Sequence, residues 1–244
     1  MTCFLRYIDF DAHEIGVELR RLRSAKDLRA VRDFMETAEA LRFSRFIIHP
    51  AVGATGIAGK RLETLSKVDS VTIVERVFVD RDLASTPEFR FQSAVDHPEA
   101  GRDGHTPGYR YNLVFDTNSE TLVRYVCCVR LIAAAHSLKA NHELDLRFAT
   151  YELLTNTLQH GVFCHDSPSV RLSIAVTSES IGVVYKDNAE PFDTDVERDL
   201  DVGVLIKNKT KRGLGLWLIQ KLANEFTFDR EGQWNVTRLR LVCE

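Results

Sequence analysis

Three polar residues recur at intervals of four in the segment YELLTNTLQHG, namely Glu152, Asn156 and His160. If this segment is helical, the spacing stacks the three side chains on one face. A carboxylate and an amide oxygen one turn apart can hold a hard cation and can orient a hydroxyl group or a water molecule. The same spacing is also common on the solvated face of a surface helix, so the triplet alone leaves both interpretations open.

A second candidate is Asp187, in the segment VVYKDNAEPFD. It comes at the end of an expected strand, where the chain enters a proline-containing loop. Functional residues are often held in such loops by a rigid scaffold. An aspartate that closes an Asx-turn would give the same pattern, and this alternative stays open.

A third candidate is the glycine-containing run RGLGL, from Arg212 to Leu216, which precedes and begins an apolar helix. Glycines let the backbone approach a ligand closely, and a helix N-terminus offers unpaired N–H groups to phosphate. The basic segment 207–212 (KNKTKR) could add positive charge next to these glycines. A simple turn and a solvated basic loop are the alternative interpretations.

Regular elements in the C-terminal half would position these residues. Periodicity and capping patterns predict strands at Tyr111–Phe115, Leu172–Val176, Gly182–Lys186, Phe226–Phe228 and Trp234–Val242, and helices from Glu120 to about Leu138, Leu144 to about His160 and Leu214 to about Ala223. The second and third of these strands are expected to form a hairpin. The fold class is therefore α+β, with a two-layer sandwich in which helices cover one face of an antiparallel or mixed sheet.

The N-terminal half has a separate pattern. Ser24 and Asp27 form a capping-box motif ahead of a helix with apolar residues at helical spacing. Strands are predicted at Phe43–Ile48, in the β-branched run Val71–Val79 and around Phe89. A Pro-, Gly- and His-rich break at Asp96–Arg110 then divides the chain into a smaller N-terminal α+β domain, residues 1–105, whose role is open, and a C-terminal domain, residues 106–244.

Composition excludes several classes of protein. The 244 residues include 32 basic and 35 acidic side chains, so a net charge of −3 gives no general attraction for nucleic acid or for an anionic membrane. The five cysteines are odd in number and include no CxxC, which favours reduced thiols over disulfides or zinc. Apolar runs are too short for a membrane span. We expect a cytoplasmic protein that binds neither nucleic acid nor membrane.

Taken in order, the three candidates resemble the motifs of the GHKL ATPase superfamily, and most closely those of the bacterial anti-sigma-factor serine/threonine kinases. The segment ELLTN ending at Asn156 resembles the N box, DNAEPFD beginning at Asp187 resembles the G1 box, and RGLGL resembles the G2 box. The resemblance covers about Tyr111 to the C-terminus.

This resemblance implies a role for each matching position, with ATP and Mg²⁺ as cofactors. Glu152 would be the catalytic base, Asn156 the Mg²⁺ ligand, and Asp187 the acceptor of a hydrogen bond from the adenine amino group. The resemblance places the remaining nucleotide-binding positions at His160, Ala189, Lys211, Arg212, Gly213, Leu214 and Gly215.

Two departures from the family pattern leave the function open between two alternatives. Ala189 stands where the G1 box has glycine, and Thr210 and Lys211 replace glycines ahead of the G2 box. The first alternative is an ATP-dependent serine/threonine protein kinase that phosphorylates a small antagonist protein and controls a sigma factor by partner switching. The second is a non-catalytic module of the same fold that binds a protein partner. The sequence does not decide whether the protein forms a homodimer.

Overall fold

The computed structural model describes residues 3–10, 12–19, 22–50, 64–65, 67–73, 89–90, 109–117, 120–163, 168–191 and 214–243. The chain divides into two compact units. Unit 1 comprises Met1–Gln92 and Arg124–Ala140, and unit 2 comprises Ser93–Val123 and Asn141–Glu244. The domain boundary expected at residue 105 lies outside the described residues and stays a prediction.

Unit 1 contains a five-stranded mixed sheet in the order β4-β3-β2-β1-β5. Its elements are β1 (Cys3–Asp9), β2 (Glu14–Leu19), α1 (Ala25–Ala40), β3 (Arg45–Pro50), β4 (Val71–Ile73), β5 (Phe89–Arg90) and α3 (Thr121–Ala135), the last of which belongs to this unit from Arg124 onward. The pair β2 and β3 is parallel and is connected through α1, whereas β1 pairs with β2 and β5 in the antiparallel sense. Of the predicted strand Val71–Val79, residues 74–79 lie outside the described residues.

The capping box predicted at the start of α1 is confirmed. The Ser24 hydroxyl accepts a hydrogen bond from the Asp27 N–H at 3.1 Å, and the Asp27 carboxylate accepts one from the Ser24 N–H at 2.8 Å. These two bonds satisfy donors that a helix N-terminus otherwise leaves unpaired. The apolar stripe of α1 is buried at Val31, Phe34 and Ala38, which fixes the face that the helix turns inward.

Helix α3 is shorter than the sequence pattern predicts, because it ends at Ala135 instead of about Leu138. Ser137 adopts a left-handed conformation with φ of 52°, and the Leu138 N–H donates to the Ala133 carbonyl at 3.0 Å. This arrangement is a Schellman-type helix end, which stops the helix before the apolar pattern stops.

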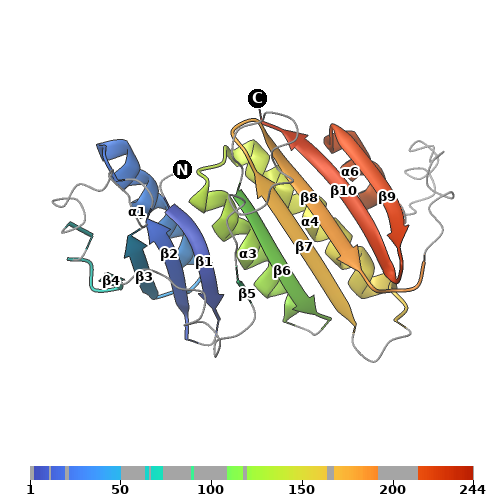
Figure 1. Cartoon of the computed structure of the whole chain (residues 1–244), viewed down its shortest axis with the longest axis horizontal. Helices are drawn as coiled ribbons and strands as arrows, with labels where there is room; N and C mark the ends of the chain where they lie inside the picture. Colours follow the sequence, from blue (N-terminus) through green and yellow to red (C-terminus); the bar gives the residue numbers. More distant parts are fainter. Residues whose placement is uncertain are drawn as a thin grey trace. The chain divides into compact units, whose positions relative to one another are not determined.

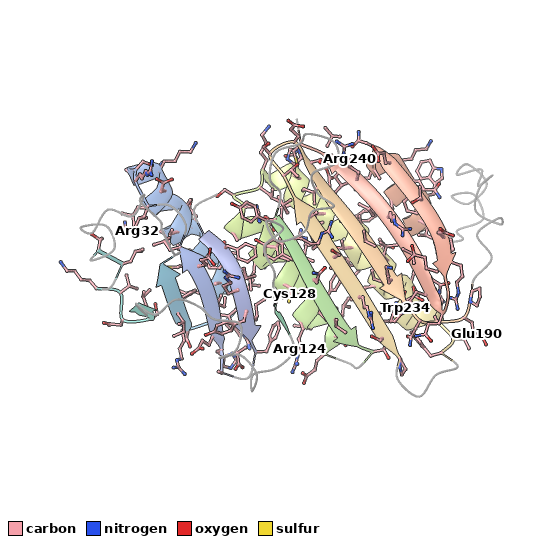
Figure 2. The ribbon with its side chains drawn as sticks, viewed as in Figure 1. Arg32, Arg124, Cys128, Glu190, Trp234 and Arg240 are labelled. Atoms are coloured by element: carbon pink, nitrogen blue, oxygen red, sulfur yellow. The ribbon has the colours of Figure 1, made fainter. Side chains whose placement is uncertain are left out.

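Inside the helix Cys128 is fully buried (Figure 2), and burial raises the pKa of its thiol, as expected for an inert core cysteine.

His136 follows α3 directly, and burial of its imidazole lowers its pKa from 6.5 to about 3. Because the folded state favours the neutral ring, the unfolded state binds the extra proton between those two pH values. The folded state therefore keeps its full stability with respect to this group above pH 6.5. It loses stability as the pH falls from 6.5 toward 3, because only the unfolded state takes up the proton. We expect the free energy of unfolding to decrease by up to about 1.4 kcal/mol per pH unit in this window.

Urea unfolding between pH 7.5 and pH 4.5 measures this dependence. The variant His136→Leu removes the titrating ring and should have a shallower slope than the wild type. Parallel curves for the two proteins would show that His136 does not contribute to the pH dependence.

Unit 2 is built on a second five-stranded sheet, in the order β6-β7-β8-β10-β9. Its elements are β6 (Tyr109–Asp116), α4 (Ala140–His160), β7 (Ser169–Val176), β8 (Ser180–Asp187), α6 (Leu214–Leu222), β9 (Glu225–Glu231) and β10 (Trp234–Val242). All described pairings are antiparallel, and the predicted β7–β8 hairpin is confirmed. In Figure 1, α4 and α6 lie behind this sheet, on the same face, so the predicted α+β class and two-layer arrangement are confirmed.

The two faces of the unit 2 sheet differ in chemistry. Strand residues that alternate toward the helices are apolar and buried, among them Ile174, Val183 and Leu239. The opposite face carries charged side chains, such as Arg240 (Figure 2), which pairs with Glu225 at 3.0 Å. This alternation fixes which residues point toward α4 and α6.

In the described part of the chain, no helix is long and apolar enough to cross a membrane.

Candidate functional site

Helix α4 carries the Glu152, Asn156 and His160 triplet, and the helix begins at Ala140, four residues before the predicted start. Its buried positions include Leu146, Leu153 and Leu154. With that side packed inward, Glu152 and Asn156 lie half-buried at its edge, and His160 is exposed at the last helical residue. The predicted helical stacking of the triplet is therefore present.

The start of α6 lies against the carboxylate of Glu152. A Cβ atom added at Gly215 would be only 2.3 Å from Oε2 of Glu152 and 3.2 Å from its Cδ. The first distance is shorter than any real Cβ contact, so a larger residue at position 215 would displace this carboxylate from its present place. Two of the sequence candidates, 63 residues apart by their numbers, thus meet at the first turn of a helix, where backbone N–H groups have no partner within the helix.

Asp187 ends β8 and is almost completely buried, with 5% of its surface exposed. Its Oδ2 accepts a hydrogen bond from the Thr157 hydroxyl of α4 at 3.3 Å. Its Oδ1 accepts from the Ala189 N–H at 3.1 Å, the bond that defines an Asx-turn. The turn and the link to α4 are both present, so this aspartate joins the end of β8 to the helix that carries Glu152.

Sequence reasoning missed two residues that complete this arrangement, Asn235 on β10 and Arg230 on β9. The Asn235 Nδ2 donates to Oδ1 of Asp187 at 2.7 Å and to the Ala189 carbonyl at 3.2 Å. The Arg230 Nη1 donates to the Asn235 Oδ1 at 2.7 Å and to the same carbonyl at 2.9 Å. Asn235 was detectable in principle, because it is a polar residue at an inward position of a strand whose other inward positions are Thr237, Leu239 and Leu241.

A family model for the histidine kinase-like ATPase domain matches residues 117–241, which are 125 of the 244 residues. The chain belongs to this ATPase domain family. The superfamily expected from the N, G1 and G2 boxes is confirmed, whereas the narrower anti-sigma-factor kinase group stays a prediction. No curated protein matches the chain.

One departure from the ATPase family pattern, Ala189, lies in a buried position beside the end of α4. Ala189, which occupies the glycine position of the G1 box, is buried at 4% exposure. Its methyl group lies next to Gly161 at the end of α4, where an added Cβ would be 3.4 Å from the Ala189 Cβ. The Glu190 N–H also donates to the Val162 carbonyl at 2.7 Å, so the G1 loop, described here for residues 188–191, is joined to the residues that follow α4. A side chain at position 161 would clash first with the Thr157 carbonyl oxygen, at 2.4 Å, so the helix end and not the Ala189 methyl group requires this glycine.

The remaining candidates of the ATPase domain are described only in part. Leu214 is the first residue of α6. Lys211, Arg212 and Gly213 lie outside the described residues, so their part in the site stays a prediction. Among the residues that the structure does describe, no group of three or more His, Cys, Asp or Glu side chains could hold a metal ion.

Proposed function

We propose that unit 2 binds ATP with Mg²⁺ and that the protein is a cytoplasmic serine/threonine kinase of the anti-sigma-factor type. It would phosphorylate a small antagonist protein and control a sigma factor by partner switching. The observation that carries this proposal is the contact between Gly215 at the start of α6 and the Glu152 carboxylate. It brings a group able to accept a proton next to helix N–H groups able to bind phosphate.

The described residues fit a nucleotide in three ways. The first turn of α6 provides N–H donors for phosphate oxygens, and glycine at position 215 removes the side chain at one position of that turn. Asn156 lies one turn beyond Glu152 on α4 and offers an amide oxygen, a ligand type that Mg²⁺ accepts. Asp187 offers a carboxylate oxygen to an amino group of the base. When bound, Mg²⁺ would neutralise negative charge on the phosphates.

The chain's own contribution to phosphoryl transfer is positioning and proton removal. Glu152 would accept the proton of a serine or threonine hydroxyl, or of water, as that oxygen attacks phosphorus. Its carboxylate lies beside the start of α6, because α4 is packed into the core and glycine at position 215 leaves room for the carboxylate there. The basic residues of segment 207–212 would add positive charge near the phosphates.

A second candidate function is a partner-binding module without catalysis. It is favoured by the state of Asp187, since both of its carboxylate oxygens already accept hydrogen bonds from protein groups. Ala189 also favours this alternative, because a G1 box with alanine departs from the pattern of the ATPase family. In this alternative, the Asp187 hydrogen bonds serve only to close the end of the sheet.

Calorimetric titration with ATP, in the presence and absence of Mg²⁺, separates the two functions. Asp187→Ala should weaken ATP binding about 10- to 100-fold, because it removes a hydrogen bond to a charged group. Asn156→Ala should retain weak binding that no longer responds to Mg²⁺. The matched controls are Glu179→Ala, an exposed carboxylate next to the other end of β8, and Asn112→Ala, an exposed amide on β6.

The wild-type result decides first. If the wild-type protein shows no heat of ATP binding at millimolar ATP, the kinase proposal fails and the partner-binding module stands. If the two control variants lose affinity as much as Asp187→Ala does, the nucleotide does not bind at this site.

A further inference from the structure

The hairpin formed by β9 and β10 holds the Asp187 carboxylate from the strand next to it. Asn235 lies directly opposite Asp187 in the β8–β10 register, and it is 1% exposed. Arg230 lies opposite Asn235 in the β9–β10 register, on the exposed edge strand of the described sheet. Three neighbouring strands therefore contribute one residue each to a single row of hydrogen bonds.

The row fixes the orientation of the Asn235 amide. An asparagine side chain has a donor end and an acceptor end, which neighbouring groups must distinguish. Arg230 can only donate, and its Nη1 donates to the Asn235 Oδ1 at 2.7 Å. The Nδ2 end must then face Asp187, to whose Oδ1 it donates at 2.7 Å. Arg230 thus fixes the orientation of the Asn235 amide, and we say that it braces Asn235. The Asn235 amide in turn holds the Asp187 carboxylate.

The two oxygens of Asp187 are left with different capacities. Oδ1 accepts from the Asn235 amide at 2.7 Å and from the Ala189 N–H at 3.1 Å. Oδ2 accepts from Thr157 alone among the described groups, at the longer distance of 3.3 Å. A carboxylate oxygen has about two lone-pair sites, so Oδ1 is saturated and Oδ2 can accept one more hydrogen bond.

We propose that Asn235, braced by Arg230, is a positioning residue that makes the site select adenine over guanine. This inference rests on the proposed nucleotide-binding function. Adenine presents one amino donor beside a ring acceptor, which suits a carboxylate with one available oxygen. Guanine presents two adjacent donors, N1–H and the 2-amino group, which suit a carboxylate that accepts with both oxygens. By occupying Oδ1, Asn235 removes the two-oxygen arrangement and with it the advantage of guanine.

The test is the ratio of the GTP and ATP dissociation constants, measured by calorimetry with Mg²⁺. The wild type should prefer ATP. Asn235→Ala frees one of the two acceptor sites of Oδ1, since the Ala189 N–H still donates to the other, and it should lower the ratio of the GTP to the ATP constant about tenfold or more. Arg230→Met removes the brace but keeps the amide, and it should lower the ratio by a smaller factor. Asn112→Ala, an exposed amide on β6, should leave the ratio unchanged.

The outcomes separate this inference from the proposed function. If the wild type binds neither nucleotide, the proposed function itself fails. If the wild type binds ATP through Asp187, but Asn235→Ala weakens ATP and GTP by equal factors, Asn235 is only structural and the inference is overturned while the function stands. Should Asn235→Ala fail to fold, as shown by circular dichroism, Arg230→Met decides alone, because it changes an exposed side chain. An unchanged ratio in Arg230→Met would then overturn the inference.

Discussion

Glu152→Gln is expected to slow phosphoryl transfer about 100- to 10,000-fold, which is the usual contribution of a general base. The amide keeps the size of the side chain and its place beside Gly215, but it cannot accept a proton from the attacking oxygen. ATP affinity should change little, because in the proposed site the start of α6, and not the carboxylate, binds the phosphates. The measurement is the release of inorganic phosphate from ATP in the presence of Mg²⁺. This assay needs no protein acceptor.

The control for this substitution lies on the same helix. Glu143 pairs with Arg147 at 3.9 Å, four residues along α4, and such partly exposed pairs contribute little to stability. Glu143→Gln should therefore retain the wild-type rate. A Glu152→Gln protein that binds ATP and releases phosphate at the wild-type rate would remove Glu152 from the role of base. Loss of ATP binding in that variant would instead assign Glu152 to the binding of nucleotide.

Local sequence patterns were sufficient to predict the elements that carry the site. The capping box at Ser24, the helix through Glu152 and the β7–β8 hairpin each depend on residues within one element or one turn. One end of α3 and one end of α4 differ from the prediction. Helix α4 begins earlier than predicted because its first turn, beginning at Ala140, is polar and carries no apolar periodicity. Helix α3 ends earlier because Ser137, one residue before the apolar Leu138, adopts a left-handed conformation.

Contacts between distant strands could not be read from periodicity. Asn235 and Asp187 are 48 positions apart, and they meet only because β10 inserts between β8 and β9 in the sheet. Arg230 reaches the G1 loop with a long side chain, and nothing in the alternation of β9 marks that reach. The same limit applies to α3. Its pattern predicted an apolar helix, but not that residues 124–140 would group with unit 1 instead of unit 2.

Gly215→Ala is expected to reduce phosphate release about 100-fold with little loss of stability. The new methyl group would be 2.3 Å from Oε2 of Glu152, so one of the two must move. The carboxylate is the end of a flexible side chain and moves more easily than the helix backbone. A displacement of about 1 Å of a reacting group can cost about 100-fold in rate. Stability should be nearly unchanged, because alanine is favoured over glycine inside a helix by up to about 1 kcal/mol.

Gly182→Ala is the matched control, because a Cβ at that position would meet only the Ala175 Cβ at 3.9 Å, an ordinary contact. A double mutant then tests the cause of the loss. If Gly215→Ala acts by displacing the Glu152 carboxylate, it should cost little further activity in a Glu152→Gln background, since residues that act as one unit are not additive. An undiminished 100-fold loss in that background would show that position 215 acts through the phosphate-binding N–H groups, independently of Glu152.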